Sequence, residues 1–178
     1  MTGQRTAGFW LALALLTGAG LMRTEAAGEA AVGAQSGLPI PRFVSLKSDR
    51  VNVRAGPTKD HDVSWVYTRA GLPVEITAEF ENWRRIRDWE GAEGWVYHSL
   101  LSGRRTALVA PTAKRIAEFI PIHLAADPDS PIAARLQPGV LAVVKRCSGT
   151  WCSLAGDGFD GWIAQERLWG VYPHEKVE

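Results

Sequence analysis

The sequence predicts an all-β protein made of two small β domains in tandem, placed after a cleaved export signal. Three observations support this prediction. Short β-branched and aromatic runs bounded by turn residues dominate from residue 42 onward. A pattern of glycines and tryptophans occurs twice, and the first 40 residues differ in composition from the rest of the 178-residue chain. We expect domains at 42–105 and 106–172, followed by a tail at 173–178.

The repeated pattern is a short β-like run ending in proline, then a glycine, a tryptophan, and a Gly-Trp pair. The first copy consists of Val51 to Pro57, Gly71, Trp83, Gly94-Trp95 and Leu101, and the second of Ile122 to Pro128, Gly139, Trp151, Gly161-Trp162 and Leu168. Self-similarity of this kind indicates two units rather than one large domain. Units this small are marginally stable alone; packing of the two against each other, or a covalent crosslink, would offset this weakness.

The amino terminus has the layout of a secretory signal peptide. A polar start with Arg5 precedes an apolar run from Ala7 to Met22, and small residues such as Ala26 and Ala27 follow. A buried helix and a membrane anchor are the alternatives, but a run with three glycines is short for a span of ~20 residues. We therefore expect a signal peptide at 1–27. The segment 28–41, rich in Ala, Gly and Pro, predicts a flexible linker.

In the first domain, alternation and turn residues predict strands near 43–46, 51–54, 63–68, 74–80, 83–89 and 94–97. The alternation in the run from Trp83 to Trp89 places both tryptophans on the same face as Arg85 and Arg87. The second domain repeats the pattern, with strands near 107–110, 120–125, 132–136, 140–146, 151–155 and 161–164. A helical turn is expected after each Gly-Trp strand. Residues 112–119, bracketed by prolines, predict an irregular connection.

Cys147 and Cys152 flank four residues that suit a hairpin loop. Opposed Cβ atoms on neighbouring strands approach to ~4.5 Å, near the ~3.5–4.5 Å that a disulfide requires. Because cysteines in exported proteins are normally oxidised, we predict a structural disulfide. A redox role is the alternative, but the spacing is not that of a C-x-x-C motif.

These motifs resemble those of the bacterial SH3-like domains. The resemblance rests on the Val-Asn-Val-Arg-x-Gly-Pro run, on Glu81 to Arg87, and on Glu93 to Val96. The second copy departs from the pattern, with Ala125 where the first has Arg54 and Asp127 where it has Gly56. The resemblance implies small β-barrels and a binding or targeting role rather than a reaction.

Charge and composition narrow the function further. The chain carries a net charge of +1, with about +4 on residues 42–115 and about −3 on 116–178, less basic than nucleic-acid-binding domains usually are. The Cys147-Ser148-Gly149 run looks like the nucleophile motif of cysteine cell-wall peptidases, which also need a histidine well downstream. The sole downstream histidine is His174, in the tail, so the sequence argues against a peptidase. The four histidines lack metal-ligand spacing. We therefore expect no catalysis, cofactor, metal or nucleic-acid partner.

Trp83, Trp95, Trp151 and Trp162 recur in both copies and are interpreted as scaffold, whereas Trp65, Trp89 and Trp169 have no counterpart. Unmatched aromatic rings are candidates for a ligand surface. We predict an aromatic and cationic groove that comprises Arg54, Trp65, Tyr67, Arg85, Arg87 and Trp89. The alternative is that these rings seal the contact between the two domains.

Together these features predict a periplasmic or secreted binding protein that recognises cell-envelope material, with peptidoglycan as the first hypothesis. No stable membrane span is expected after signal cleavage. The alternative is an adaptor that binds an extended or Pro-rich segment of an envelope protein. A sensor domain for a small ligand is a third possibility.

Overall fold

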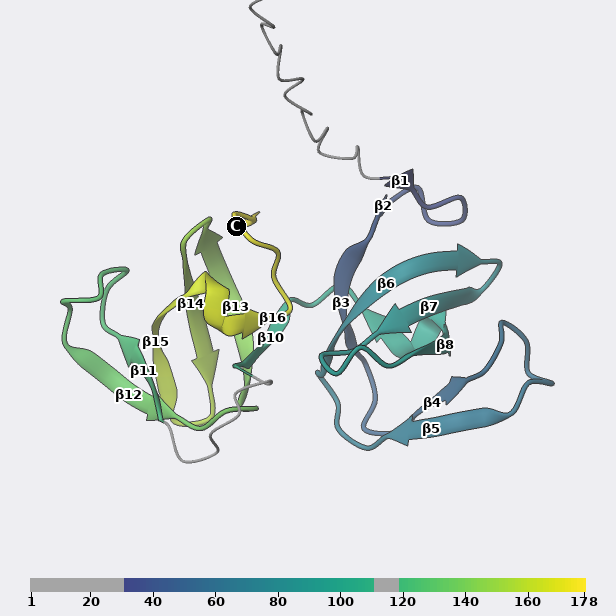
Figure 1. The fold of residues 1–178 in the computed structure, drawn as a ribbon, viewed down its shortest axis with the longest axis horizontal. Coiled ribbons are helices and arrows are strands. Elements are labelled where there is room, and N and C mark those ends of the chain that lie inside the picture. Colours follow the sequence, from purple (N-terminus) through teal and green to yellow (C-terminus); the bar gives the residue numbers. More distant parts are fainter. Residues whose placement is uncertain (1–30, 111–118) are drawn as a thin grey trace, which may run out of the picture.

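The computed structural model describes residues 31–110 and 119–178 and contains two curled antiparallel sheets side by side (Figure 1). Each sheet corresponds to one copy of the sequence repeat, so the predicted all-β tandem is confirmed. The predicted signal peptide and the predicted connection, apart from Phe119, lie outside the described residues. Within the described ranges, no helix is long and apolar enough to cross a membrane.

The first module is a sheet with strand order β5-β4-β8-β7-β6-β3-β9. Its strands are β3 (Arg42–Leu46), β4 (Val51–Arg54), β5 (Val63–Tyr67), β6 (Pro73–Phe80), β7 (Trp83–Arg87), β8 (Glu93–Tyr97) and β9 (Leu101–Ser102). All the predicted strands are present, although β7 ends before Trp89. The predicted helical turn is the 3₁₀ turn η1 (His98–Leu100), after which β9 pairs with β3 and curls the sheet.

The second module repeats this order as β12-β11-β15-β14-β13-β10-β16. Its strands are β10 (Thr106–Val109), β11 (Ile120–His123), β12 (Ile132–Leu136), β13 (Leu141–Ser148), β14 (Trp151–Gly156), β15 (Phe159–Ala164) and β16 (Leu168–Trp169). The 3₁₀ turn η2 (Gln165–Arg167) is in the predicted place. Residues 173–178 are not a free tail, because β17 (Lys176–Val177) pairs with β13.

Each module has its own apolar core on the concave side of its sheet. In the first, Val53, Ile86 and Val96 are fully buried, whereas Arg85 and Arg87 alternate with Ile86 and are exposed. In the second, Ile122, Leu154 and Ile163 are the corresponding residues. The period-2 pattern of the sequence therefore determines which side chains enter each core.

The strand registers align the two copies and correct one expectation. Arg54 pairs with Trp95 on β8, and His123 pairs with Trp162 on β15. His123, rather than Ala125, therefore occupies the position of Arg54. The sequence comparison aligned Pro57 with Pro128, but these prolines lie at different places in loops of equal length. The sequence alignment was wrong here because it matched similar loop residues. The strand registers show which positions correspond.

The predicted flexible linker at 28–41 is wrong for the part that is described. β1 (Ala31–Val32) and β2 (Pro39–Ile40) form a short hairpin. The hairpin loop is attached to the Glu79 side chain, which accepts hydrogen bonds from the backbone N–H groups of Gln35 and Ser36 at 3.0 and 2.9 Å and from Ser36 Oγ at 2.6 Å. Sequence composition missed this because the partner lies more than 40 residues away.

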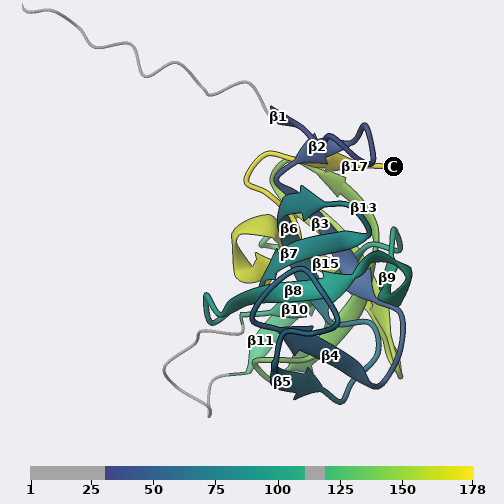
Figure 2. The same cartoon turned by 90° about the vertical axis from the view of Figure 1, so that its right-hand side faces the viewer.

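Corresponding positions on the two sheets are joined by different chemistry. Glu79 pairs with Arg84 across β6 and β7, and an ion pair of 3.2 Å links their side chains. In the second module the same position of the ladder holds Cys147 and Cys152, whose Cα atoms are 4.1 Å apart in the predicted disulfide. A terminal segment packs at each of these places, the amino-terminal hairpin on one and β17 on the other. Figure 2 shows both segments at the same end of the molecule.

The two modules pack against each other through equivalent strands. Where the first module has Ser45 and Ser102 in paired positions of β3 and β9, the second has Leu108 and Trp169 in β10 and β16. Leu108 is 3% exposed and belongs to the core cluster of the first module. The Trp169 ring meets Phe43 edge-on with centroids 5.1 Å apart, and its Nε1 donates to the Pro73 carbonyl at 3.3 Å. Trp169 therefore seals the contact between the modules.

A buried carboxylate lies in the same contact. Glu75 on β6 is 2% exposed and accepts a hydrogen bond of 2.8 Å from Tyr172 Oη of the second module. Arg87 on the neighbouring strand donates to the other carboxylate oxygen at 2.9 Å through Nε. Burial, followed by the hydrogen bond to Glu75, raises the pKa of Tyr172 well above its usual value. The carboxylate thus connects a cation of one module to a phenol of the other.

The interface predicts that unfolding of the modules is coupled. Replacement of Trp169 by Ala removes a large ring from between them, so we expect a loss of about 3 kcal/mol in the free energy of unfolding and a separation of one urea transition into two. Trp162→Ala, on an exposed face, is the control and should cost about 1 kcal/mol or less. Equal effects of the two substitutions would contradict the assigned role of Trp169.

The Glu79 site predicts acid sensitivity of the amino-terminal hairpin. Burial alone would raise the pKa of Glu79, but hydrogen bonds from Ser36, Arg42 and Gln35 outweigh it and lower the pKa from 4.5 to about 2. Because the folded-state pKa is lowered, this stabilisation is complete above pH 4.5 and is lost as pH falls towards 2. Hydrogen-exchange protection factors of the Gln35 and Ser36 amides should follow that course. Glu79→Gln should lower them above pH 4.5 and remove most of their pH dependence, and Glu81→Gln should leave them unchanged.

Candidate functional site

The aromatic residues of the predicted groove lie at the edge of the first core. Trp65 and Tyr67 alternate on β5 opposite the buried Val53 and Val51, so both point inward. The Tyr67 ring lies between Trp65 and Trp89, with centroid distances of 6.2 and 6.4 Å. The two tryptophans are half-buried and pack on the core cluster. These rings therefore cover the core of the first module next to its edge strand β5.

Tyr67 is held by a buried hydrogen bond. Its Oη donates to Asp88 Oδ2 at 2.7 Å, while Asp88 Oδ1 accepts from the Glu90 and Ala92 amides at 3.0 and 2.9 Å. Burial and the bond to Asp88 raise the pKa of Tyr67 far above its usual value. One carboxylate thus joins β5 to the turn after β7, and this contact places Trp89 beside Tyr67.

Arg54 has a structural partner in its own loop. Its Nη1 donates to the His61 carbonyl at 2.6 Å across the loop between β4 and β5. In the second module, His123 Nδ1 makes the same contact with the Ser130 carbonyl at 2.8 Å. The backbone closes both loops in the same way, by Ala55 N–H to Asp62 and by Leu124 N–H to Pro131. Two different side chains therefore hold equivalent loops.

The other two arginines of the predicted groove lie on the outer face of β7. Arg85 forms an ion pair with Glu93, and both side chains are partly exposed. Arg87 pairs with Glu75 at the contact between the modules, and this carboxylate raises the pKa of the Arg87 guanidinium. The predicted groove is therefore divided: its aromatic side chains face the core, and its arginines face outward.

Trp95 is the aromatic residue that lies beside the outward-facing Arg54 and Arg85. On the outer face of the sheet it pairs with Arg54 on one side and with Arg85 on the other, and cross-strand pairs project from the same face. The ring is half-buried, which leaves part of it open to solvent. Sequence reasoning assigned Trp95 to the scaffold because it recurs. Its alternation with the buried Val96 was the signal that it faces outward.

The second module has a similar pair of aromatic ring and cation. Arg146 lies over the Trp162 ring with its guanidinium carbon 4.7 Å from the centroid. In the first module Ala78 pairs with Arg85, whereas in the second Arg146 pairs with Ser153. The arginine that corresponds to Arg85 therefore lies on the neighbouring strand in the second module. Trp95 has two arginines beside it, Arg54 and Arg85, and Trp162 has Arg146.

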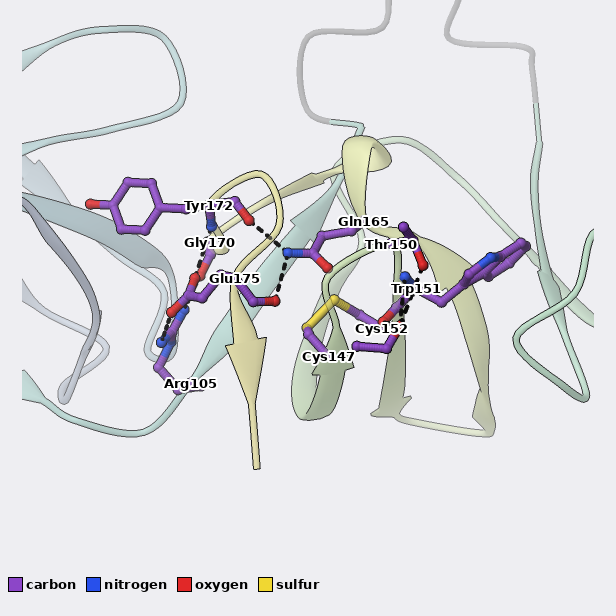
Figure 3. The surroundings of a disulfide bond; sticks show 10 residues. Arg105, Cys147, Thr150, Trp151, Cys152, Gln165, Gly170, Tyr172 and Glu175 are labelled. Carbon is purple, nitrogen blue, oxygen red and sulfur yellow. Dashed lines mark hydrogen bonds and ion pairs between the residues drawn. A yellow bond between two sulfur atoms is a disulfide. The ribbon is translucent and has the colours of Figure 1, made fainter. Parts of the chain in front are cut away.

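The remaining repeated tryptophans differ in exposure. Trp83 is 8% exposed and packs edge-on against its cross-strand neighbour Tyr97, with centroids 5.5 Å apart. Trp151 occupies the same position, but its neighbour across the ladder is Ala164. Trp151 is only half-buried and lies between hollows of about 440 and 200 Å³. Figure 3 shows its indole extending away from the disulfide hairpin.

The chain matches the family described as bacterial SH3 domain twice, over residues 47–103 and 117–170. The protein therefore belongs to the bacterial SH3 domain family, with two copies of the domain, and this membership supports a binding role. No curated protein matches the chain.

Two solved structures are similar to the chain, NlpC2 and NlpC1 from Trichomonas vaginalis, each with 12% sequence identity and a TM-score of 0.31. The matches cover 72% and 77% of this chain and 48% of each of those chains. The chain thus spans about half the length of these proteins.

The contact between Arg54 and the His61 carbonyl predicts local stabilisation of the loop. Arg54→Ala removes a charge-assisted hydrogen bond, typically worth about 1.5 kcal/mol, so protection of the Ala55 amide against hydrogen exchange should fall about tenfold. The Leu124 amide in the equivalent loop is the internal control and should keep its protection. Unchanged exchange at Ala55 would contradict the stabilising role assigned to this hydrogen bond.

Proposed function

We propose that the protein is an exported, non-catalytic binding protein of the cell envelope and that its ligand is peptidoglycan. The observation that carries this proposal is the row formed by Arg54, Trp95 and Arg85 on the outer face of the first module. This row replaces the divided groove of the sequence prediction. It keeps the combination of aromatic and cationic groups for which that groove was proposed.

The row suits a polymer of sugars and acidic peptides. A partly exposed indole stacks on the apolar face of a sugar ring, and a guanidinium binds carboxylates with good geometry. Residues 42–115 carry a net charge of about +4, which attracts an anionic polymer over longer distances. The Arg85–Glu93 pair is exposed enough for a ligand carboxylate to compete for the guanidinium.

A non-catalytic role is consistent with the use of the buried carboxylates in the first module. Glu75 connects the modules, Glu79 holds the amino-terminal hairpin, and Asp88 orders the turn beside Tyr67. Each is satisfied by structural partners. The proposal therefore assigns these groups to the scaffold rather than to acid–base chemistry.

Export is supported by the disulfide between Cys147 and Cys152, because such bonds form and persist in oxidising compartments. A location in the periplasm or outside the cell follows from the same proposal. An adaptor that binds a protein segment is the second candidate function. It is favoured by a different feature, the hollows on either side of Trp151.

Co-sedimentation with purified sacculi tests the proposal. The mature protein should pellet with sacculi at low ionic strength, and its affinity should fall as salt screens the arginines. Trp95→Ala should weaken binding about tenfold, equivalent to about 1.4 kcal/mol. Phe80→Ala removes another exposed aromatic side chain of the first module and should have no effect. If the wild-type protein stays in the supernatant at low salt, the peptidoglycan proposal is wrong.

A further inference from the structure

The second module contains a well-formed hollow that is lined by none of the residues predicted to bind a ligand. We call it the Trp151 pocket; its volume is about 440 Å³, and it is lined by the tip of the hairpin with the disulfide, by η2 and by the carboxyl-terminal segment. Its lining includes Trp151, Ala164, Gln165, Leu168 and Val171. Most of this surface is apolar.

The pocket exists because the second copy has a small residue at one position. In the first module the Tyr97 ring covers Trp83. At the same place the second module has Ala164, and the space left by the missing ring opens beside Trp151. The first module has a hollow of only about 200 Å³ at the corresponding end, and Trp83 does not line it.

One polar group in this lining lacks a partner. The Gln165 side chain is buried, and its Nε2 donates to the Tyr172 and Glu175 carbonyls at 2.6 and 3.0 Å. These two acceptors fix the orientation of the amide, so Oε1 points away from them, towards the disulfide hairpin (Figure 3). Oε1 has no hydrogen-bond partner among the described residues. A buried acceptor without a donor is unfavourable, and a ligand N–H would satisfy it.

A second hollow on the other side of Trp151 extends the site. It has a volume of about 200 Å³, and Phe119, His123 and Ile163 help to line it. Trp151, Ala164 and Glu166 line both hollows. A mainly apolar hollow and a smaller, more polar one, separated by one ring, suit an extended peptide, in which side chains two residues apart project to the same side at a spacing of roughly 7 Å.

The same features argue against a sugar at this place. A sugar ring presents several hydroxyl groups, and each would need a polar partner on burial. The lining of the Trp151 pocket is mostly apolar; its polar side chains are Thr150, Gln165, Glu166 and His174, and Gln165 Oε1 is its buried acceptor without a partner among the described residues. An extended peptide instead presents apolar side chains and one N–H per residue. Glu166 lines both hollows and Arg167 lines the second, so these two charges offset each other locally; the net negative charge of residues 116–178 favours a peptide that also carries cations.

We propose that the Trp151 pocket binds an extended peptide segment that has apolar side chains in alternate positions and flanking cationic residues. Its apolar side chains enter the hollows on either side of Trp151, and one of its backbone N–H groups donates to Gln165 Oε1. This site is separate from the outer face of the first module, so it does not depend on the peptidoglycan proposal.

Titration of the full mature protein with the blocked peptide acetyl-Lys-Leu-Ala-Leu-Lys-amide tests the inference. The Trp151 indole N–H resonance should shift with added peptide, and the Trp95 indole resonance should not. A peptide with both leucines replaced by alanine should bind at least tenfold more weakly. Methylation of the two leucine nitrogens should also weaken binding at least fivefold, because it removes donors for Gln165.

Ala164→Tyr is the decisive variant, because it reproduces the arrangement that the first module tolerates and fills the pocket. It should weaken binding at least tenfold. Ala155→Tyr, on the same outer face of the second module but outside both hollows, is the matched control and should bind like wild type. Ala164→Leu provides the same test if the tyrosine variant does not fold.

Three results would overturn the inference. The first is no shift of the Trp151 resonance at millimolar peptide, and the second is binding of the peptide by the Ala164 variants as tightly as by the wild-type protein. The third is a shift of the Trp151 resonance with soluble peptidoglycan fragments but not with the peptide. Because the sacculus assay depends on Trp95, and this titration on Trp151, failure of one proposal is distinguishable from failure of the other.

Discussion

The Glu75 carboxylate is the group on which the arrangement of the two modules depends. It is almost completely buried between them, and a buried carboxylate must be compensated by hydrogen bonds and a countercharge. Arg87 supplies the charge from the first module, and Tyr172 supplies a hydrogen bond from the second. If the modules separated, Tyr172 would lose this acceptor. The carboxylate therefore favours one relative orientation of the sheets, in which Trp169 covers Phe43.

Because the orientation is fixed, the residues that differ between the two copies form surfaces at a defined position relative to each other. The row around Trp95 and the pocket around Trp151 lie on separate modules whose relative position is set by the same interface. Both arise from a few substitutions on a common framework. Arg85 faces Ala78 in one copy where Ser153 faces Arg146 in the other, and Tyr97 is replaced by Ala164. A shared scaffold thus presents two unlike surfaces.

Local patterns predicted most of the fold. Alternation located the strands, the shared Gly-Trp pairs located the 3₁₀ turns, and the hairpin spacing predicted the Cys147–Cys152 disulfide. The features that were missed or left open depend on residues distant in the chain. The contact of Glu79 with the amino-terminal hairpin was missed, and the packing of Trp169 on the first module was only one of two alternatives. Neither contact leaves a periodic signal in the sequence.

The candidate site was predicted less well, for a related reason. Composition grouped arginines with nearby aromatic residues, but Trp65 and Tyr67 have the inward parity of β5, whereas Arg54 and Arg85 have the outward parity of their own strands. The outward orientation of Trp95 could have been predicted from its alternation with Val96. The exposure of Trp151 was not predictable, because it depends on the missing ring across the ladder.

The ladder position shared by Glu79–Arg84 and Cys147–Cys152 gives the two copies different chemical sensitivities. Protons neutralise a carboxylate but leave a disulfide intact, whereas reductants cleave a disulfide but leave an ion pair intact. Acid therefore acts first on the segment that leads into the protein from its amino terminus, and reduction acts on the strand that carries β17. At one shared ladder position, the two terminal segments of the described chain are therefore associated with bonds that fail under different conditions.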